Sequence, residues 1–199
     1  QCYILDLGAN VECDANHLYQ FSILGSALVQ SLEINAKPVI GLLNVGSEEF
    51  KGNDTIKNAG QLMQESKLNY AGFVEGDEMF NGSFDVIVSD GFAGNIALKS
   101  IEGVAKLISH FIKTEFSKSI FTKLAALISY PVMRAVKNKV DPRKYNGASL
   151  LGLQGVVVKS HGGADSYAFS QAINTAYYEV KNGILDKIES LVHSGGSDA

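Results

Sequence analysis

The chain has 199 residues, of which 46% are hydrophobic and 19% charged, and its formal net charge is −4. This composition is typical of one soluble globular domain, and the acidic balance gives no overall attraction to nucleic acid, which is not expected as a partner. The two cysteines are too few for a disulfide framework, and no apolar run reaches the roughly 18 residues of a membrane span. No metal-ligand spacing occurs, so neither a metal nor a cofactor is predicted.

Strand-like and helix-like segments alternate along the chain, which predicts an α/β fold with a largely parallel sheet. Strands are expected over Cys2–Leu7, Pro38–Asn44, Asn69–Glu75, Phe84–Ser89 and Val156–Lys159. Helices are expected over Ala15–Leu32, 53–66, Leu98–Phe116 and Ser166–Lys181. Asp14 can cap the first helix, and the C-terminal "SGGSDA" is expected to form a mobile tail.

Residues 111–140 depart from this rhythm, because basic and apolar side chains are interspersed there at helical spacing. Pro131 is expected to bend or split this segment into two helices, which would form a helical hairpin. One interpretation buries the apolar face in the core or a dimer interface, and the other places it at a membrane surface with lysines near anionic headgroups. The apolar residues assigned to these roles are Phe121, Leu124, Leu127, Ile128 and Val132.

The stretch "DVIVSDGFAGNIALKS" joins an apolar strand to a helix through Gly91 and Gly94. We expect an anion site at the helix N-terminus after Gly94, where unpaired N–H groups and the helix dipole favour phosphate. The glycines would let the ligand approach, Asn95 would cap the helix or contact the ligand, and Lys99 would add a full charge. Asp90 is a candidate proton acceptor. The alternative is an ordinary strand–helix turn with a surface lysine.

A second junction, "GVVVKSHGGADSYAF", is expected to bring Lys159, Ser160 and His161 to the carboxyl edge of the same sheet. These residues offer a charge, a hydrogen-bond donor and a group that titrates near neutrality. A histidine in a glycine-rich loop can equally be a structural hydrogen-bonding group. Two further strand ends contribute Asn44 and Asn10 as candidate substrate-binding residues.

Five blocks of the sequence occur in collinear order: "LDLGANVECDANHLYQFSILGSAL", "GLLNVGSEEFKGND", "SDGFAGNIALKSIEG", "DPRKYNGASLLGLQGVVVKSHGGAD" and "AFSQAI". Together they resemble the phosphate acyltransferases of the PlsX type over essentially the whole chain. The resemblance implies a three-layer α/β/α sandwich similar to isocitrate and isopropylmalate dehydrogenases, with a protruding helical hairpin over 111–140. Members carry a preceding portion with a "DAMGGD"-like motif, which has no match here. Residues 1–199 are therefore expected to be the C-terminal part of a single domain.

The resemblance also implies transfer of a long-chain acyl group from acyl-acyl carrier protein to inorganic phosphate. The acyl phosphate formed would be used by a membrane glycerol-3-phosphate acyltransferase in phospholipid synthesis. The family implies a cytoplasmic homodimer that associates peripherally with the inner face of the cell membrane. Two alternatives remain: a non-catalytic membrane-associated scaffold, and a relative of phosphotransacetylases or dehydrogenases.

On this interpretation phosphate, held by Asn95 and Lys99, attacks the acyl thioester directly. Lys159 or Ser160 would stabilise the oxyanion, and His161 would protonate the departing thiolate or keep phosphate dianionic. The acidic carrier protein would dock on a basic patch formed by Lys137, Lys139, Arg143 and Lys144.

Overall fold

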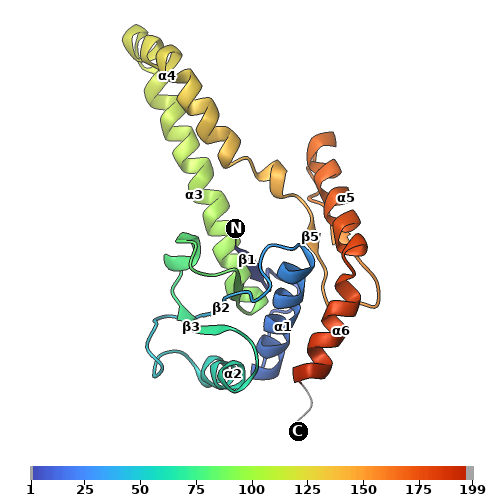
Figure 1. Cartoon of the computed structure of the whole chain (residues 1–199). Helices are drawn as coiled ribbons and strands as arrows, with labels where there is room; N and C mark the ends of the chain where they lie inside the picture. The colour runs from blue at the N-terminus through green and yellow to red at the C-terminus, as the bar shows by residue number, and fades with distance from the viewer. Residues whose placement is uncertain (1, 196–199) are drawn as a thin grey trace.

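The computed structural model describes residues 2–195, and Figure 1 shows a body of strands and helices from which one pair of helices projects. Within this range, parallel strands form a sheet in the order β1-β4-β2-β3. The strands are β1 (Tyr3–Leu5), β2 (Ile40–Leu43), β3 (Tyr70–Val74) and β4 (Val86–Val88). Leu5 pairs with Val88, which pairs in turn with Leu42, so β1, β4 and β2 end at one edge of the sheet.

The sheet is covered on both faces, as buried parallel strands require. Helices α1 (Ala15–Ser31) and α2 (Asp54–Glu65) contact each other and the strands. Alternate residues of β4 belong to two hydrophobic clusters of the core: Val86 and Val88 pack in the first, and Ile87 packs in the second. The first cluster also includes Leu18, Val29, Ile40, Leu42, Ala59 and Met63. The second includes Val74 and also Met79 of the short helix η1 (Glu78–Phe80). The predicted α/β class with a parallel sheet flanked by helices is confirmed.

Helix starts follow the capping residues in the sequence. Asp14 caps α1 by accepting from the His17 backbone N–H, as predicted, and Asn53 caps α2 by accepting from Ile56. Helix α5 (Ser166–Lys181) has the predicted bounds and is capped by Asp165. Each cap satisfies an amide that the helix itself leaves unpaired, which fixes where the helix begins.

The expected fifth strand of the main sheet is wrong. Within the described residues, β6 (Val158–Lys159) pairs antiparallel with β5 (Ala148–Ser149) in a separate two-stranded sheet. The Leu150 N–H donates to the Val157 carbonyl and closes the loop between them. The predicted strand thus pairs with the segment that precedes it in sequence, across the 150–157 loop.

The projecting helices are α3 (Gly91–Ser117) and α4 (Ile120–Lys139), which lie side by side (Figure 1). We call residues 111–139 the arm. The predicted boundary at 111 falls inside α3, which also begins seven residues before the predicted Leu98. The split at Pro131 is wrong, because α4 continues through that residue. The chain turns instead at Ser119, whose side chain and backbone exchange hydrogen bonds with Thr122. This capping box gives hydrogen-bond partners to the Ser119 and Thr122 amides, which stabilises a helix start at this point. Pro131 removes only one backbone N–H donor from α4, and the helix continues through it.

The remaining elements are η2 (Pro142–Tyr145), which contacts α5, and α6 (Ile184–Gly195), which packs on α1. Residues 194–195 of the expected tail belong to α6, and the rest of that tail lies outside the described residues. Within residues 2–195 no helix combines the length and apolarity needed to cross a membrane.

Candidate functional site

The loop after β1 folds around the carboxylate of Asp6, at the edge where the strands end. Asp6 accepts hydrogen bonds from the amides of Gly8 and Ala9 at 2.9 Å and from Asn10 N at 2.6 Å and Nδ2 at 2.9 Å. Asp6 is buried, so these donors replace the water it lost on folding. The predicted ligand-binding residue Asn10 therefore lies at the sheet edge, but its side-chain amide holds Asp6.

The first turn of α3 lies directly against this loop. Gly91 N donates to the Asn10 carbonyl at 2.8 Å, and Asp90 caps the helix by accepting from Ala93 N at 2.6 Å. Gly94 N donates to the Asp90 carbonyl at 3.0 Å. The expected N-terminus after Gly94 is thus wrong, and Asp90 takes the capping role assigned to Asn95. These amides are bonded within the chain and cannot cradle an anion.

The two glycines of this turn serve close contact between segments. A Cβ on Gly94 would lie 1.9 Å from the Asp6 carbonyl oxygen, and one on Gly91 would lie 2.6 Å from that of Asn10. Neither distance tolerates a side chain, because the atoms met are backbone. The Asn95 side chain lies beside Gly8, 3.5 Å from the position of an ideal Cβ there. The predicted residues are therefore brought together, but the glycines are explained by contact with the β1–α1 loop.

A carboxylate that the sequence analysis did not identify pairs with the predicted residue Lys99. Lys99 Nζ lies 3.1 Å from Glu102 Oε2, and the pKa of Glu102 is lowered chiefly by this hydrogen bond. The charges of Lys106 and His161 lower the same pKa further. His161 belongs to the loop after β6, so a group from a separate predicted segment acts electrostatically on this carboxylate. The i, i+3 spacing of Lys99 and Glu102 on a helix was the available signal.

The loop that carries His161 is held by Asn146, which the sequence analysis also missed. Asn146 Nδ2 donates to Ser160 Oγ at 2.9 Å and to the Ala168 carbonyl at 2.8 Å. Its Oδ1 accepts from the His161 backbone N–H at 2.9 Å. The Asn-Gly pair at 146–147 was a turn signal that could have drawn attention to it.

The hydrogen bonds of this loop orient its side chains. His161 Nδ1 accepts from Gly163 N at 3.0 Å, so the neutral imidazole carries its proton on Nε2 and presents a donor. Ser160 Oγ accepts from Asn146, which leaves the hydroxyl proton free to donate. Lys159 lies in β6 and is exposed. The loop thus offers hydrogen-bond donors to an incoming anion or oxyanion.

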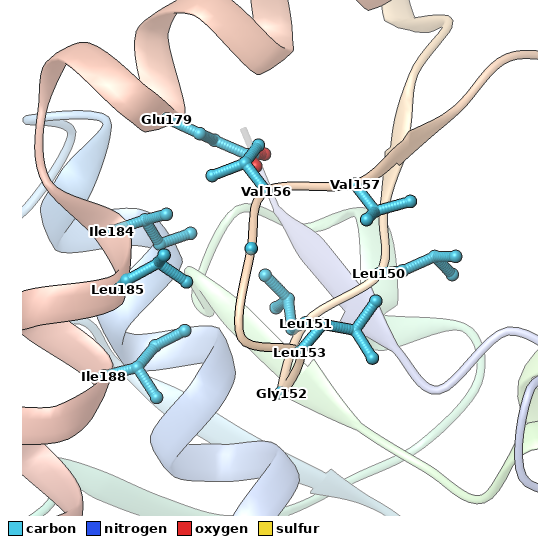
Figure 2. A pocket seen from close by; sticks show the side chains of 11 residues that line it. Leu150, Leu151, Gly152, Leu153, Val156, Val157, Glu179, Ile184, Leu185 and Ile188 are labelled. Atoms are coloured by element: carbon cyan, nitrogen blue, oxygen red, sulfur yellow. The ribbon is translucent and has the colours of Figure 1, made fainter.

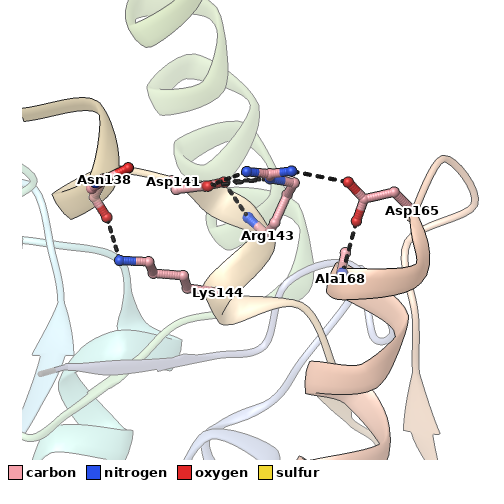
Figure 3. Close-up of polar contacts among 6 residues, drawn as sticks. All are labelled: Asn138, Asp141, Arg143, Lys144, Asp165 and Ala168. Atoms are coloured by element: carbon pink, nitrogen blue, oxygen red, sulfur yellow. Dashed lines mark hydrogen bonds and ion pairs between the residues drawn. The ribbon is translucent and has the colours of Figure 1, made fainter. Parts of the chain in front are cut away.

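Arg143 fastens η2 to the start of α5 (Figure 3). Its guanidinium contacts Asp141 Oδ2 at 2.7 Å and Asp165 Oδ2 at 3.0 Å, and Asp165 also accepts from Ala168 N. The hydrogen bonds from Arg143 lower the pKa of Asp141 to about 2. Lys144 Nζ donates to the Asn138 carbonyl at 2.6 Å. Within the predicted basic patch, Arg143 is therefore neutralised by two carboxylates, and Lys144 is engaged within the chain.

Asn44 follows β2 and supports its own loop. Its Nδ2 donates to the Lys51 carbonyl at 3.2 Å, and its Oδ1 accepts from Val45 N at 2.9 Å. A Cβ on Gly52, whose φ is +89°, would lie 2.4 Å from Asn44 Oδ1. The side chain is thus at the expected sheet edge but is committed to the β2–α2 loop.

An apolar pocket lies between the β5–β6 loop and the helices α5 and α6 (Figure 2). Glu179 of α5 is 1% exposed and accepts a hydrogen bond from Ser149 Oγ. Burial raises the pKa of this carboxyl, because an apolar surrounding disfavours its charged form. The lining residues include Leu150, Leu151, Leu153, Val156, Val157, Ile184, Leu185 and Ile188.

The apolar side chains predicted to dimerise or contact membrane are exposed in the single chain. Phe121 of α4 is 80% exposed and Leu124, the least exposed of the set, 56%. The exposed fractions of Leu127, Ile128 and Val132 lie between these two values. A helix that places such side chains in water has an apolar surface suited to a partner.

These features define an α/β protein with a parallel sheet, at whose edge the β1–α1 loop packs against the first turn of α3. A family model described as "Fatty acid synthesis protein" matches residues 1–187, and the chain belongs to this family. It is 54% identical over 192 residues to a phosphate acyltransferase of Alkalilimnicola ehrlichii, covering 96% of this chain and 56% of the relative. A phosphate acyltransferase of Methylococcus capsulatus is 55% identical over 186 residues, covering 94% and 55%. The chain spans about half the length of the curated relatives it matches.

Proposed function

We propose that this chain is the part of a phosphate acyltransferase that binds inorganic phosphate and orients it toward the thioester of acyl-acyl carrier protein. The observation that carries the proposal is the exposed ammonium group of Lys99, which lies 3.1 Å from the Glu102 carboxylate on the helix face that also carries Asn95. His161 of the 159–163 loop offers a neutral Nε2–H donor. Relatives named phosphate acyltransferase support the reaction class.

Phosphate would bind on the side-chain face of α3, because the amides of Gly91, Ala93 and Gly94 are already bonded within the chain. Asn95 and Lys99 are four residues apart, so they lie on one face of the helix and can contact the same anion. Asp90, Gly91 and Gly94 hold this turn in place against the β1–α1 loop, and Asn10 and Asn44 support the neighbouring strand ends. Their contribution to substrate binding is thus through position.

In the proposed reaction a phosphate oxygen attacks the thioester carbonyl carbon. A C–O bond to phosphate forms, the C–S bond breaks, and the carrier protein leaves as a thiolate that takes a proton from solvent. His161 would donate its Nε2–H to the developing oxyanion, with the Ser160 hydroxyl or Lys159 as a second donor. Full transfer of that proton is disfavoured, because it would leave an imidazolate. The tautomer set by Gly163 therefore favours stabilisation of the oxyanion over proton donation to the thiolate.

We further propose a three-layer sandwich similar to isocitrate and isopropylmalate dehydrogenases, and a cytoplasmic homodimer bound peripherally to the inner face of the membrane. The exposed apolar residues of the arm support both contacts, and its lysines would face anionic headgroups. A membrane glycerol-3-phosphate acyltransferase would consume the acyl phosphate. Leu127→Glu should abolish sedimentation with anionic vesicles or shift the dimer to monomer in analytical ultracentrifugation; an effect on neither measurement would refute these contacts.

The reaction is tested by incubating long-chain acyl-acyl carrier protein with this chain and, separately, with an N-terminally extended form. We expect phosphate-dependent release of free carrier protein, and a loss of about 10²–10³ in rate for His161→Ala in the active form. Lys99→Ala should show a similar loss, whereas Lys118→Ala, which removes an exposed lysine at the far end of α3, should not. No phosphate-dependent release by either form would refute the acyltransferase and leave a non-catalytic scaffold.

A further inference from the structure

Glu102 is the centre of a small charge cluster on α3. Lys99, three residues before it, and Lys106, four residues after it, share its helix face. Lys99 Nζ is 3.1 Å from the carboxylate, with both side chains partly open to solvent. The charges of Lys106 and His161 also act on this carboxylate and lower its pKa.

The pair with Lys99 is poorly explained as a device for stability. Exposed pairs of this kind contribute little, and a helix favours Glu on the N-terminal side of Lys, whereas here Lys99 precedes Glu102. Lys106 stands at the favoured position, four residues after the glutamate. Glu102 therefore has two alternative partners on the same face, and only one of them is at the site.

We propose that Glu102 is an internal anion that occupies the phosphate site until phosphate displaces it. This inference rests on the proposed function. A phosphate dianion takes the place of the carboxylate beside Lys99 and His161, and Glu102 moves to Lys106. The exchange keeps Lys99 paired when the site is empty and makes Lys106 a positioning residue, since it acts on phosphate through Glu102.

The exchange is tested by equilibrium dialysis of radiolabelled inorganic phosphate against the 199-residue chain. Glu102→Gln removes the competing charge, so we expect phosphate to bind about two- to fivefold more tightly, the range that an exposed ion pair provides. Glu115→Gln is the matched control, because Glu115 pairs with Lys118 at the same spacing but is separated from the site. It should leave the phosphate Kd unchanged.

Lys106→Ala separates displacement from simple attraction. It should weaken phosphate binding in the wild-type background, where Glu102 loses its second partner, and have little effect when Glu102 is already Gln. An unchanged or weaker Kd in Glu102→Gln, or an equal effect of Lys106→Ala in both backgrounds, overturns the exchange. Phosphate binding that Lys99→Ala leaves intact, or that is absent from every variant, refutes the proposed site itself. Far-UV circular dichroism verifies that each variant is folded.

Discussion

Gly94→Ala tests whether α3 is fixed to the β1–α1 loop or left open for a ligand. The new Cβ would lie 1.9 Å from the Asp6 carbonyl oxygen and 2.7 Å from Ser89 Oγ. The first is a backbone atom of a loop held by four hydrogen bonds to the Asp6 carboxylate, so it cannot turn aside. Relief requires α3 to move away by more than an ångström, which disrupts the 2.8 Å bond from Gly91 to Asn10.

The size of the effect follows from two opposing terms. Overfilling a tight contact costs about 1–3 kcal/mol or more, whereas replacing glycine by alanine inside a helix stabilises it by about 1 kcal/mol. The 1.9 Å approach to a backbone atom places Gly94→Ala at the upper end of that cost, about 3 kcal/mol, so the net expectation is a loss of about 2 kcal/mol in the free energy of unfolding. Gly103 of the same helix has no atom within 4 Å of an ideal Cβ position, so Gly103→Ala should gain up to about 1 kcal/mol.

Urea unfolding followed by circular dichroism at helical wavelengths measures both variants, and the two should differ by about 3 kcal/mol. The informative comparison is between these glycines, since both are helical and only one meets a neighbour. Equal or greater stability of Gly94→Ala than of the wild type would refute the contact. If Gly94→Ala loses phosphate binding but keeps the stability of the wild type, Gly94 serves ligand access instead.

Three further predictions concern the loops around the site. Asn146→Asp keeps the acceptor for the His161 amide but loses the hydrogen bonds donated to Ser160 and Ala168, so kcat should fall about tenfold with little change in KM. An unchanged kcat would refute the role of Asn146 in positioning the loop. Arg143→Met should accelerate cleavage of residues 161–165 in limited proteolysis, because it frees the start of α5, and wild-type resistance would contradict this. The folded-state pKa of Glu179 is raised above its unfolded value of 4.5, so the free energy of unfolding should fall as pH rises from 4.5 through the folded-state pKa. Glu179→Gln should abolish this pH dependence of the urea midpoint, and a pH dependence that persists would exclude the carboxyl as its source.

The strands of the sheet could be predicted because buried parallel strands have continuous apolar sequences. Val86–Val88 is apolar at every position and is buried on both faces, so its pattern leaves little choice of structure. The same reasoning failed for Val158–Lys159, where the pattern predicts a strand but does not identify its partner. Apolar periodicity carries no information about the partner: β6 pairs with the strand that precedes it, whereas β4 pairs with β1 and β2 and not with β3, its predecessor in sequence.

The sequence suggested the charged residues of the candidate site, and it missed the groups that hold the surrounding loops in place. Lys99 and His161 were identified by their chemistry, but Asn146 acts through backbone contacts that only the folded loop creates. The start of α3 was misplaced because its glycines were assigned to the junction that precedes the helix. The capping rule favours Asp90, and Gly91 and Gly94 are tolerated because the adjoining loop fills the space of their missing side chains.

The continuity of α3 connects the site to the arm. Its 27 residues span about 40 Å, from the first turn against the β1–α1 loop to the end of the arm. Lys99, Glu102 and Lys106 occupy the stretch between these ends, so any partner or surface that covers the arm acts on the helix that carries the charge cluster. A helix transmits such a constraint because its backbone hydrogen bonds keep neighbouring turns in register. The predicted boundary at 111 divided one continuous helix. Binding of a partner or membrane to the arm and affinity for phosphate should therefore be measured together.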